Sequence, residues 1–152
     1  MLTDTTKAII RLATIDDILP CVMLIRKLRL ATFWQHLDAD SETGVAGVLL
    51  AHRLLTSKSS CLYVADVDGV VVGLCGGELT SHFMSPHITL LIEWAWWVEP
   101  DNRESSIGAR LWLTVCEWGK QRGAKAALRT RVLSSEKRGK QLGEESYSVK
   151  EL

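Results

Sequence analysis

The sequence predicts one mixed α/β domain of 152 residues, on three observations. Its length suits a single domain, because compact domains mostly run from about 100 to 200 residues. Apolar residues make up 47% and charged residues 24% of the chain, which is typical of a globular protein. Segments that alternate like strands are interleaved with segments in which apolar residues recur every three or four positions, as on one face of a helix.

The N-terminal part is expected to form a strand and two helices. Ala8–Ala13 is short and partly apolar, like a strand. Thr14–Asp17 supplies helix-start chemistry, a hydroxyl that can accept from free amides and two acids near the positive end of the dipole. Apolar residues at helical spacing follow over residues 18–28. A break around Phe33–Asp40 separates this helix from a second one, predicted over Ser41–Leu55.

Three strands are expected in the middle of the chain. Cys61–Val67 and Val70–Leu74 flank the turn dipeptide Asp68-Gly69, which predicts a two-residue hairpin. A loop over Thr80–His87 leads to Ile88–Val98, whose apolar residues occupy both alternating faces. That pattern is typical of a central strand covered on both sides.

The remaining elements are a helix and two strands. Pro100 ends the central strand, and apolar spacing from Ile107 to Trp118 predicts a helix that stops at Gly119 or Gly123. Ala126–Val132 is predicted as a strand, and Tyr147–Leu152 as a last short one. Ser134–Glu145 is polar and fits no single element.

Charge and cysteine content argue against several classes of protein. Eighteen Lys and Arg balance eighteen Asp and Glu, unlike a dedicated nucleic-acid binder, although residues 119–140 hold eight bases and one acid. The four cysteines lie far apart in apolar runs, which predicts buried thiols rather than disulfides or metal ligands. With no apolar leader and no apolar run beyond eleven residues, we expect a soluble cytoplasmic protein without a membrane segment.

The segment between the central strand and the next helix carries the predicted ligand chemistry. Small residues at 105, 106 and 108 let the backbone approach a ligand closely. The free amides and the dipole of a helix start favour an anion, and Arg103 adds a permanent positive charge. The segment is therefore either a phosphate or pyrophosphate site or an ordinary strand-to-helix turn.

This segment resembles the signature of the GNAT N-acetyltransferase superfamily, Arg/Gln-x-x-Gly-x-Gly/Ala after a strand that often ends Val-x-Pro. Here Val98-Glu99-Pro100 is followed by Arg103-x-x-Ser106-x-Gly108, and the order of elements also fits. The strand Glu-x-x-Trp-Trp-Val-x-Pro at residues 93–100, the pair Glu117-Trp118 and the Tyr-x-x-Lys-Glu-Leu ending are similar to a branch common in phage genomes.

The resemblance covers roughly residues 8–133 and implies a fold. It implies one GNAT-like domain over residues 1–152, with a mixed, mostly antiparallel twisted sheet, helices on both faces and an atypical part at 134–152. It also implies acetyl-CoA as acyl donor, no metal, and an amine acceptor that is a small molecule or a protein amine. A homodimer is a further expectation, through an exposed sheet edge near the C-terminal end.

The resemblance also implies which residues bind acetyl-CoA. The loop and helix start would hold the pyrophosphate, and the backbone of a bulged strand would pair with the pantetheine arm. The implied residues are Trp96, Trp97 and Val98 on the strand and Arg103, Glu104, Ser105, Ser106, Ile107, Gly108 and Ala109 after it.

Glu93 is the candidate general base for deprotonating the amine. It is the only charged residue of the run Ile88–Val98, and burying a carboxylate is costly unless it is paired, hydrated or functional. Several relatives carry their base on this strand. The alternative is a Glu paired with an Arg or an amide for structural reasons.

The sequence departs from the family pattern at Ser106, which is tolerable because a serine leaves its amide free, and more seriously in a segment after the fifth strand that is shortened. Ser106 stands where a glycine is commoner, and the region around Gly139 to Gly143 lacks the Tyr that usually acts as the acid. Tyr147 matches a later strand. The alternative function is therefore a catalytically weak or inactive acyl-CoA-binding or protein-interaction module.

Other polar residues are secondary candidates. His82 and His87 flank a Ser-Pro loop and would line an acceptor site or lie in solvent. Lys137, Arg138 and Lys140 would meet the phosphates of CoA if the basic stretch lies beside the loop, and would otherwise be a solvated face.

Overall fold

A single mixed sheet organises the computed structural model, which describes residues 7–31, 45–132 and 145–152. Its six strands lie in chain order, and every neighbouring pair is antiparallel except β4 and β5, which run parallel. The strands are β1 (Ile9–Leu12), β2 (Ser60–Val67), β3 (Val70–Ser81), β4 (Thr89–Val98), β5 (Ala124–Val132) and β6 (Glu145–Glu151). This confirms the expected mixed, mostly antiparallel sheet.

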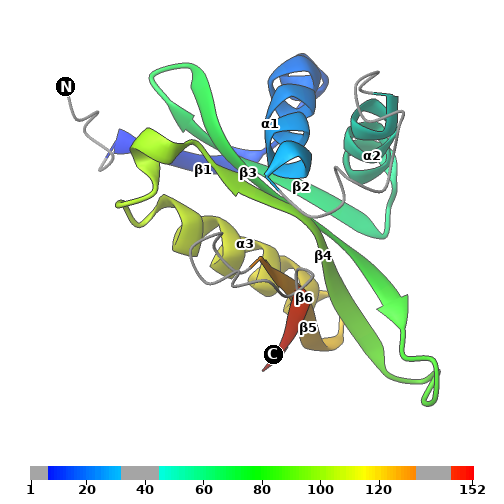
Figure 1. The fold of residues 1–152 in the computed structure, drawn as a ribbon. Coiled ribbons are helices and arrows are strands. Elements are labelled where there is room, and N and C mark those ends of the chain that lie inside the picture. The colour runs from blue at the N-terminus through cyan, green and yellow to red at the C-terminus, as the bar shows by residue number, and fades with distance from the viewer. Residues whose placement is uncertain (1–6, 32–44, 133–144) are drawn as a thin grey trace, which may run out of the picture.

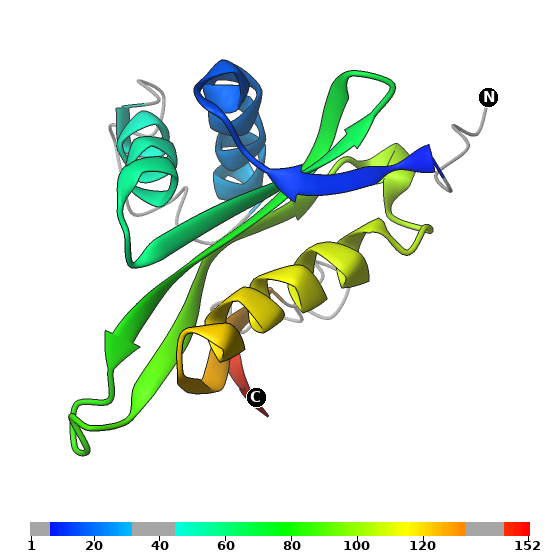
Figure 2. The same ribbon diagram turned by 180° about the vertical axis from the view of Figure 1, so that it is seen from behind.

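Helices cover both faces of the sheet. α1 (Ile18–Leu30) and α2 (Val45–Thr56) lie over one face and α3 (Ile107–Gln121) lies over the other (Figure 1, and from behind in Figure 2). The buried apolar side chains form two clusters accordingly, one that includes Leu111 and Val115 of α3 and one that includes Leu24 of α1 and Leu54 of α2. No helix in the described ranges is long and apolar enough to cross a bilayer.

The hairpin after β2 forms as its turn dipeptide predicts. Asp68 and Gly69 have φ of 52° and 84°, the left-handed values that a two-residue turn of this kind requires. The β-branched run Val70–Leu74 begins β3, which continues through Gly76 and Gly77 to Ser81. The glycines in β3 suit close packing: a Cβ at Gly76 would lie 2.7 Å from Leu54 Cδ1.

The ends of the other elements agree with the predictions to within a few residues where they are described, and residues 41–44 of the predicted second helix lie outside the described residues. The structure resolves the choice of helix end, because Gly123 has a φ of 88° just after α3 whereas Gly119 lies inside the helix against Leu91. The predicted break at residues 33–40 and the ambiguous segment up to residue 144 lie outside the described residues.

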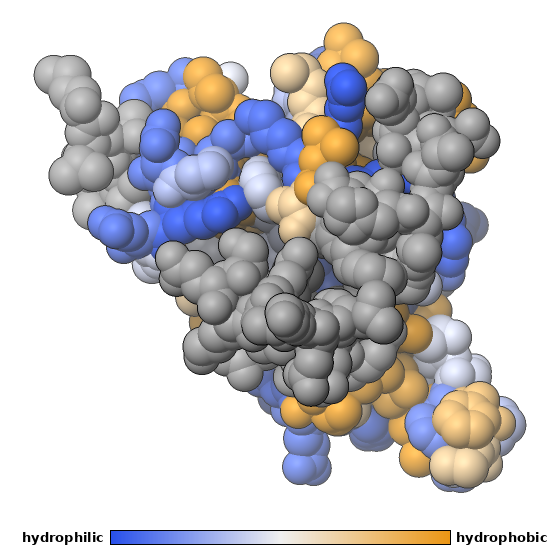
Figure 3. Space-filling model, in the orientation of Figure 1, coloured by the Kyte–Doolittle hydropathy of each residue, from blue (hydrophilic) through white to orange (hydrophobic). Residues whose placement is uncertain are grey.

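The hairpin between β3 and β4 projects from the body of the molecule, and its end is pale orange in Figure 3, at lower right. Phe83 and Met84 at this end are 84% and 72% exposed. His82 there accepts hydrogen bonds at Nδ1 from the amides of Met84 and Ser85, both at 3.2 Å. His82 therefore shapes the loop.

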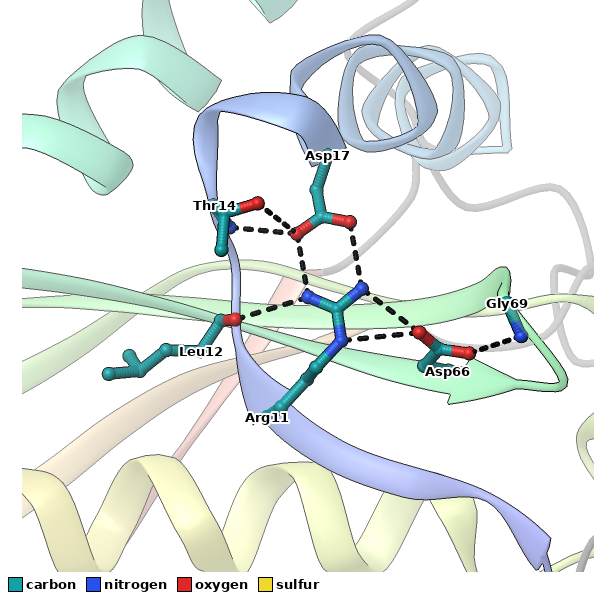
Figure 4. A network of polar contacts seen from close by, with 6 residues as sticks. All are labelled: Arg11, Leu12, Thr14, Asp17, Asp66 and Gly69. Atoms are coloured by element: carbon teal, nitrogen blue, oxygen red, sulfur yellow. Dashed lines mark hydrogen bonds and ion pairs between the residues drawn. The ribbon is translucent and has the colours of Figure 1, made fainter.

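A network of charged groups joins β1, β2 and the start of α1 (Figure 4). Arg11 donates to both oxygens of Asp17, at 2.7 and 2.9 Å, and to Asp66 at 3.0 and 3.2 Å. Asp17 also accepts from the amide of Thr14 at 2.7 Å. The helix-start chemistry predicted for this segment is therefore present, with the carboxylate of Asp17 accepting from the backbone of Thr14.

We expect this network to make stability depend on pH. Hydrogen bonding from Arg11 is the main reason that the pKa of Asp17 is lowered from 3.8 to about 2. Because the pKa is lower in the folded state, the ionised carboxylate stabilises the fold above pH 4, and the effect is lost as the pH falls towards 2.

Urea unfolding of wild type and Asp17→Asn from pH 6 to pH 2 measures this contribution. The variant should lose about 2 kcal/mol of unfolding free energy at pH 6, and the difference should vanish near the lower pH. Asp16→Asn is the matched control, because Asp16 is exposed and outside the network. Parallel pH profiles for wild type and Asp17→Asn would contradict the assignment.

Candidate functional site

The edge of β4 that faces β5 changes character at Ile92. The parallel pairing of the two strands runs from Thr89 opposite Ala124 to Ile92 opposite Leu128, and goes no further. Within the described part of the chain, β4 residues 93–98 therefore pair with β3 alone. Residues 94–97 have no pairing on the β5 side with any described strand, so their backbone N–H and C=O groups on that side remain for another partner.

A bulge in β4 begins at the same point. Gly77 pairs with Glu93 and Gly76 with Ala95, so Trp94 is an extra residue without an opposite number on β3. Beyond it, Trp96 and Val98 pack in the α3-side core, and Ala95 and Trp97 pack in the core under α1 and α2. The tryptophans thus fill both sides of the sheet, as expected for Trp96 and Trp97, while Trp94 stays 47% exposed.

The loop after β4 ends in unused backbone donors. A 3-10 turn, Pro100–Asn102, leads to α3, which begins at Ile107. The amides of Glu104, Ser106, Gly108 and Ala109 donate to no acceptor among the described residues, as expected for a helix start. Together with the helix dipole, these amides would favour an anion at this end of α3.

The substitution of Ser106 for the commoner glycine is explained by its backbone. Ser106 has φ −75° and ψ −1°, which any residue adopts. Its side chain makes no capping hydrogen bond to the helix. Serine therefore fits here without strain, and its amide stays available.

Sequence analysis missed Asn102 in this loop. Its side chain is 5% exposed, and Nδ2 has no hydrogen-bond partner in the described structure. A buried amide without a partner is unfavourable, so a partner from outside the chain would stabilise it. The turn residues Pro100-Asp101-Asn102 were the only sequence signal for this position.

Arg103 is held at the end of β4. Its Nε donates to the carbonyl of Val98 at 2.8 Å, and its guanidinium lies 4.4 Å from the centre of the Trp97 ring. These contacts fix the side chain within the loop. The structure therefore brings together most of the residues that the sequence singled out from 96 to 109.

In the described part of the basic stretch 119–140, Arg129 lies beside this site. The guanidinium of Arg129 lies 5.1 Å from the Trp96 ring centre and 5.7 Å from that of Trp112, and the two indoles stack on each other. A Cβ on Gly108 would lie 3.8 Å from the Trp96 ring. The Trp96 side chain therefore lies between Arg129 and the loop. Lys137, Arg138 and Lys140 lie outside the described residues.

Glu93 lies where β4 and β5 part and is 8% exposed. It pairs with Gly77, on the face covered by α3. Its charge and that of Arg129 both act on the buried Cys75 thiol, whose pKa is raised mainly by burial, raised further by Glu93 and lowered by Arg129. Glu93 and Arg129 therefore place a negative and a positive charge close to the point where β4 and β5 stop pairing.

The cysteines are buried and free, as predicted. Burial raises the pKa of Cys21 and that of Cys61 to about 12, and also raises that of Cys116. A thiol with so high a pKa is a poor nucleophile at neutral pH. The raised pKa values therefore give no sign of an activated thiol at these cysteines.

A second carboxylate, which sequence analysis missed, lies on the opposite face of the sheet. Glu78 of β3 forms an ion pair with Arg53 of α2, and the guanidinium of Arg53 lies 5.9 Å from the ring centre of Trp94. Glu78 directly follows the β3 glycines, and its contact with Arg53 depends on the packing of α2 on the sheet, which the sequence does not show.

Solved structures share this architecture. An acetyltransferase from Vibrio fischeri is 21% identical, with a TM-score of 0.61 over 80% of this chain and 93% of its own. A predicted acetyltransferase from Clostridium acetobutylicum, solved with acetyl-CoA, is 15% identical, with a TM-score of 0.66 over 86% and 84%.

A third solved structure, AAC(6')-Iy in complex with the bisubstrate analogue CoA-S-monomethyl-acetylneamine, is 18% identical. It has a TM-score of 0.62 over 86% of this chain and 82% of its own. At these identities the likeness establishes the fold.

The sequence comparisons give two results. A search among proteins with curated descriptions found no significant match. The family model for the acetyltransferase (GNAT) family matches residues 23–142, which is most of the chain. By this match the chain belongs to the GNAT acetyltransferase family.

Proposed function

We propose that this protein is an N-acetyltransferase that uses acetyl-CoA as donor and an amine as acceptor. The observation that carries the proposal is the junction of two sets of unused backbone groups. The edge of β4 at residues 94–97, which pairs with no described strand on the β5 side, leads to the free amides at the start of α3. Acetyl-CoA has polar groups for both sets: the amides of its pantetheine arm would pair with the backbone of β4, and its pyrophosphate would accept from the amides of α3.

The residues present fit acetyl-CoA. The amides of Ser106, Gly108 and Ala109 would bind the pyrophosphate, and the buried Nδ2 of Asn102 gives that end one more donor. Arg103 would add charge from the same loop. The backbone of Trp96–Val98 would pair with the amide groups of the pantetheine arm, as an added strand would.

Acetyl-CoA would supply a thioester carbonyl open to attack and a thiolate that leaves. The open backbone N–H groups of β4 would polarise the carbonyl oxygen. As the new N–C bond forms and the C–S bond breaks, Glu93 would accept the proton that the amine loses, directly or through a water. No side-chain acid is assigned, since a thiolate is a stable leaving group.

Turnover measurements on Glu93→Gln test the role of this carboxylate. Calorimetry should show acetyl-CoA binding to wild type and variant with the same dissociation constant. In a panel of primary amines, kcat should fall about a hundredfold in the variant, because the general base is lost. Glu117→Gln, an exposed change on α3, is the matched control.

The outcomes separate the candidate functions. Absence of acetyl-CoA binding at high micromolar concentration would refute the proposal. Binding without turnover of any amine would favour the alternative, an acyl-CoA-binding or protein-interaction module. Unchanged turnover in Glu93→Gln would remove the base assignment and leave the enzyme proposal standing.

Several finer expectations remain part of this proposal. They are a cytoplasmic location, likeness to the phage-genome branch, no nucleic-acid partner, and pairing of two copies. The outer edge of β6 has no partner strand among the described residues, which supports such pairing.

A further inference from the structure

The surface beside the β4 bulge carries an aromatic ring, a carboxylate and a guanidinium that the proposed reaction does not use. These are Trp94 on β4, Glu78 on β3 and Arg53 on α2, here called the Trp94 cluster. Arg53 lies 5.9 Å from the Trp94 ring centre and is ion-paired with Glu78. Trp94 follows Glu93 in the chain, and their side chains lie on opposite faces of the sheet at the edge where β4 and β5 part.

Trp94 and Glu78 together have the composition of a cation site. The face of an indole attracts a positive charge, and a carboxylate beside it adds a charge-assisted hydrogen bond. In this structure the guanidinium of Arg53 occupies that position. The protein's own side chain therefore shows that a cation is held there.

Arg53 holds its position weakly. Its side chain is 55% exposed, whereas that of Glu78 is 20% exposed. An ion pair with so much solvent access contributes little to stability, because water and salt screen it. The guanidinium can therefore move into solvent at small cost and leave Glu78 and the Trp94 ring to another cation.

We propose that the Trp94 cluster binds an ammonium group of the acceptor, in exchange for Arg53, and that the acceptor is a diamine or polyamine. The assignment of an acceptor rests on the proposed function. The amine that attacks the thioester must be uncharged, so a site for a positive charge suits a second amino group. Glu78 and Trp94 thus become specificity residues, with Arg53 as their internal competitor.

Binding of 1,6-diaminohexane, followed by NMR of the tryptophan indole N–H groups, tests this proposal without acetyl-CoA. The signal of Trp94 is identified as the one of six that Trp94→Phe removes. It should shift saturably with the diamine and not with 1,6-hexanediol, the uncharged analogue of equal length. The other five indole signals report whether each variant keeps its fold.

Two substitutions give opposite expected results. Glu78→Gln should weaken diamine binding about tenfold, because a charge-assisted contact is lost. Arg53→Gln should tighten it about threefold, because the competitor is removed. If the pair were only structural, both substitutions would act in the same direction or have no effect. Glu117→Gln is again the control.

Three results would overturn the proposal: equal shifts with diamine and diol, binding unaffected by Glu78→Gln, or binding weakened by Arg53→Gln. If acetyl-CoA binds and the diamine does not shift Trp94, this inference fails and the proposed function stands. If the diamine behaves as expected and acetyl-CoA does not bind, the cation site stands and the proposed function fails.

Discussion

Ser106→Glu is expected to abolish acetyl-CoA binding and to leave the fold intact or slightly more stable. Ser106 lies at the start of α3, beside the amides that would hold the pyrophosphate, and its side chain is exposed. A carboxylate about 5 Å from a phosphate in partly screened surroundings is repelled by about 3 kcal/mol, or more than a hundredfold in the dissociation constant.

The same carboxylate acts favourably on the helix. A negative charge at a helix N-terminus stabilises by about 0.3–1 kcal/mol, because it opposes the positive end of the dipole. Calorimetric titration with acetyl-CoA and thermal unfolding would measure the two effects on the same sample. Lower affinity for acetyl-CoA together with unchanged or higher thermal stability would indicate a ligand site, whereas a loss of both would indicate a misfolded variant.

Ser81→Glu is the control for the added charge. Ser81 is exposed at the far end of β3, paired with Thr89, and belongs to no part of the proposed site. It should leave binding unchanged. Equal affinity in wild type and Ser106→Glu would show that the anion does not bind at the start of α3.

Leu111→Ala is expected to cause the largest loss of stability. Leu111 is fully buried, and its Cδ1 would lie 3.2 Å from a Cβ at Gly73, so it packs directly on β3. Truncating a leucine at such a site costs about 3 kcal/mol, for the lost burial and for the cavity. In a domain of this size the melting temperature should fall by about 6–12 °C.

Leu113→Ala on the same helix is the matched control. Leu113 is 53% exposed, so its truncation should change the unfolding free energy by less than about 0.5 kcal/mol. Urea unfolding of both variants provides the comparison. Similar losses in the two would mean that α3 does not pack on the sheet through Leu111.

Features of the site that depend on neighbouring residues could be predicted from the sequence, and features that depend on contacts between distant segments could not. The Asp68-Gly69 turn and the free amides after Arg103 follow from local backbone preferences, so sequence was sufficient for them. The partners of the β3 glycines did not follow, because the side chains packed on them, such as Leu54 of α2 on Gly76, lie far away in the sequence. Asn102 was missed because its burial depends on the folded loop.

By itself, then, the sequence determined the order of elements, the family signature and one buried charge, Glu93. Tertiary structure decided which face each side chain of β4 takes. Strict alternation would put Trp94 and Trp96 on one face, but the bulge places Trp94 beside Arg53 of α2 and Trp96 against Trp112 of α3. A bulge is fixed by pairing with a neighbouring strand, and that pairing is not visible in the spacing of residues along one segment.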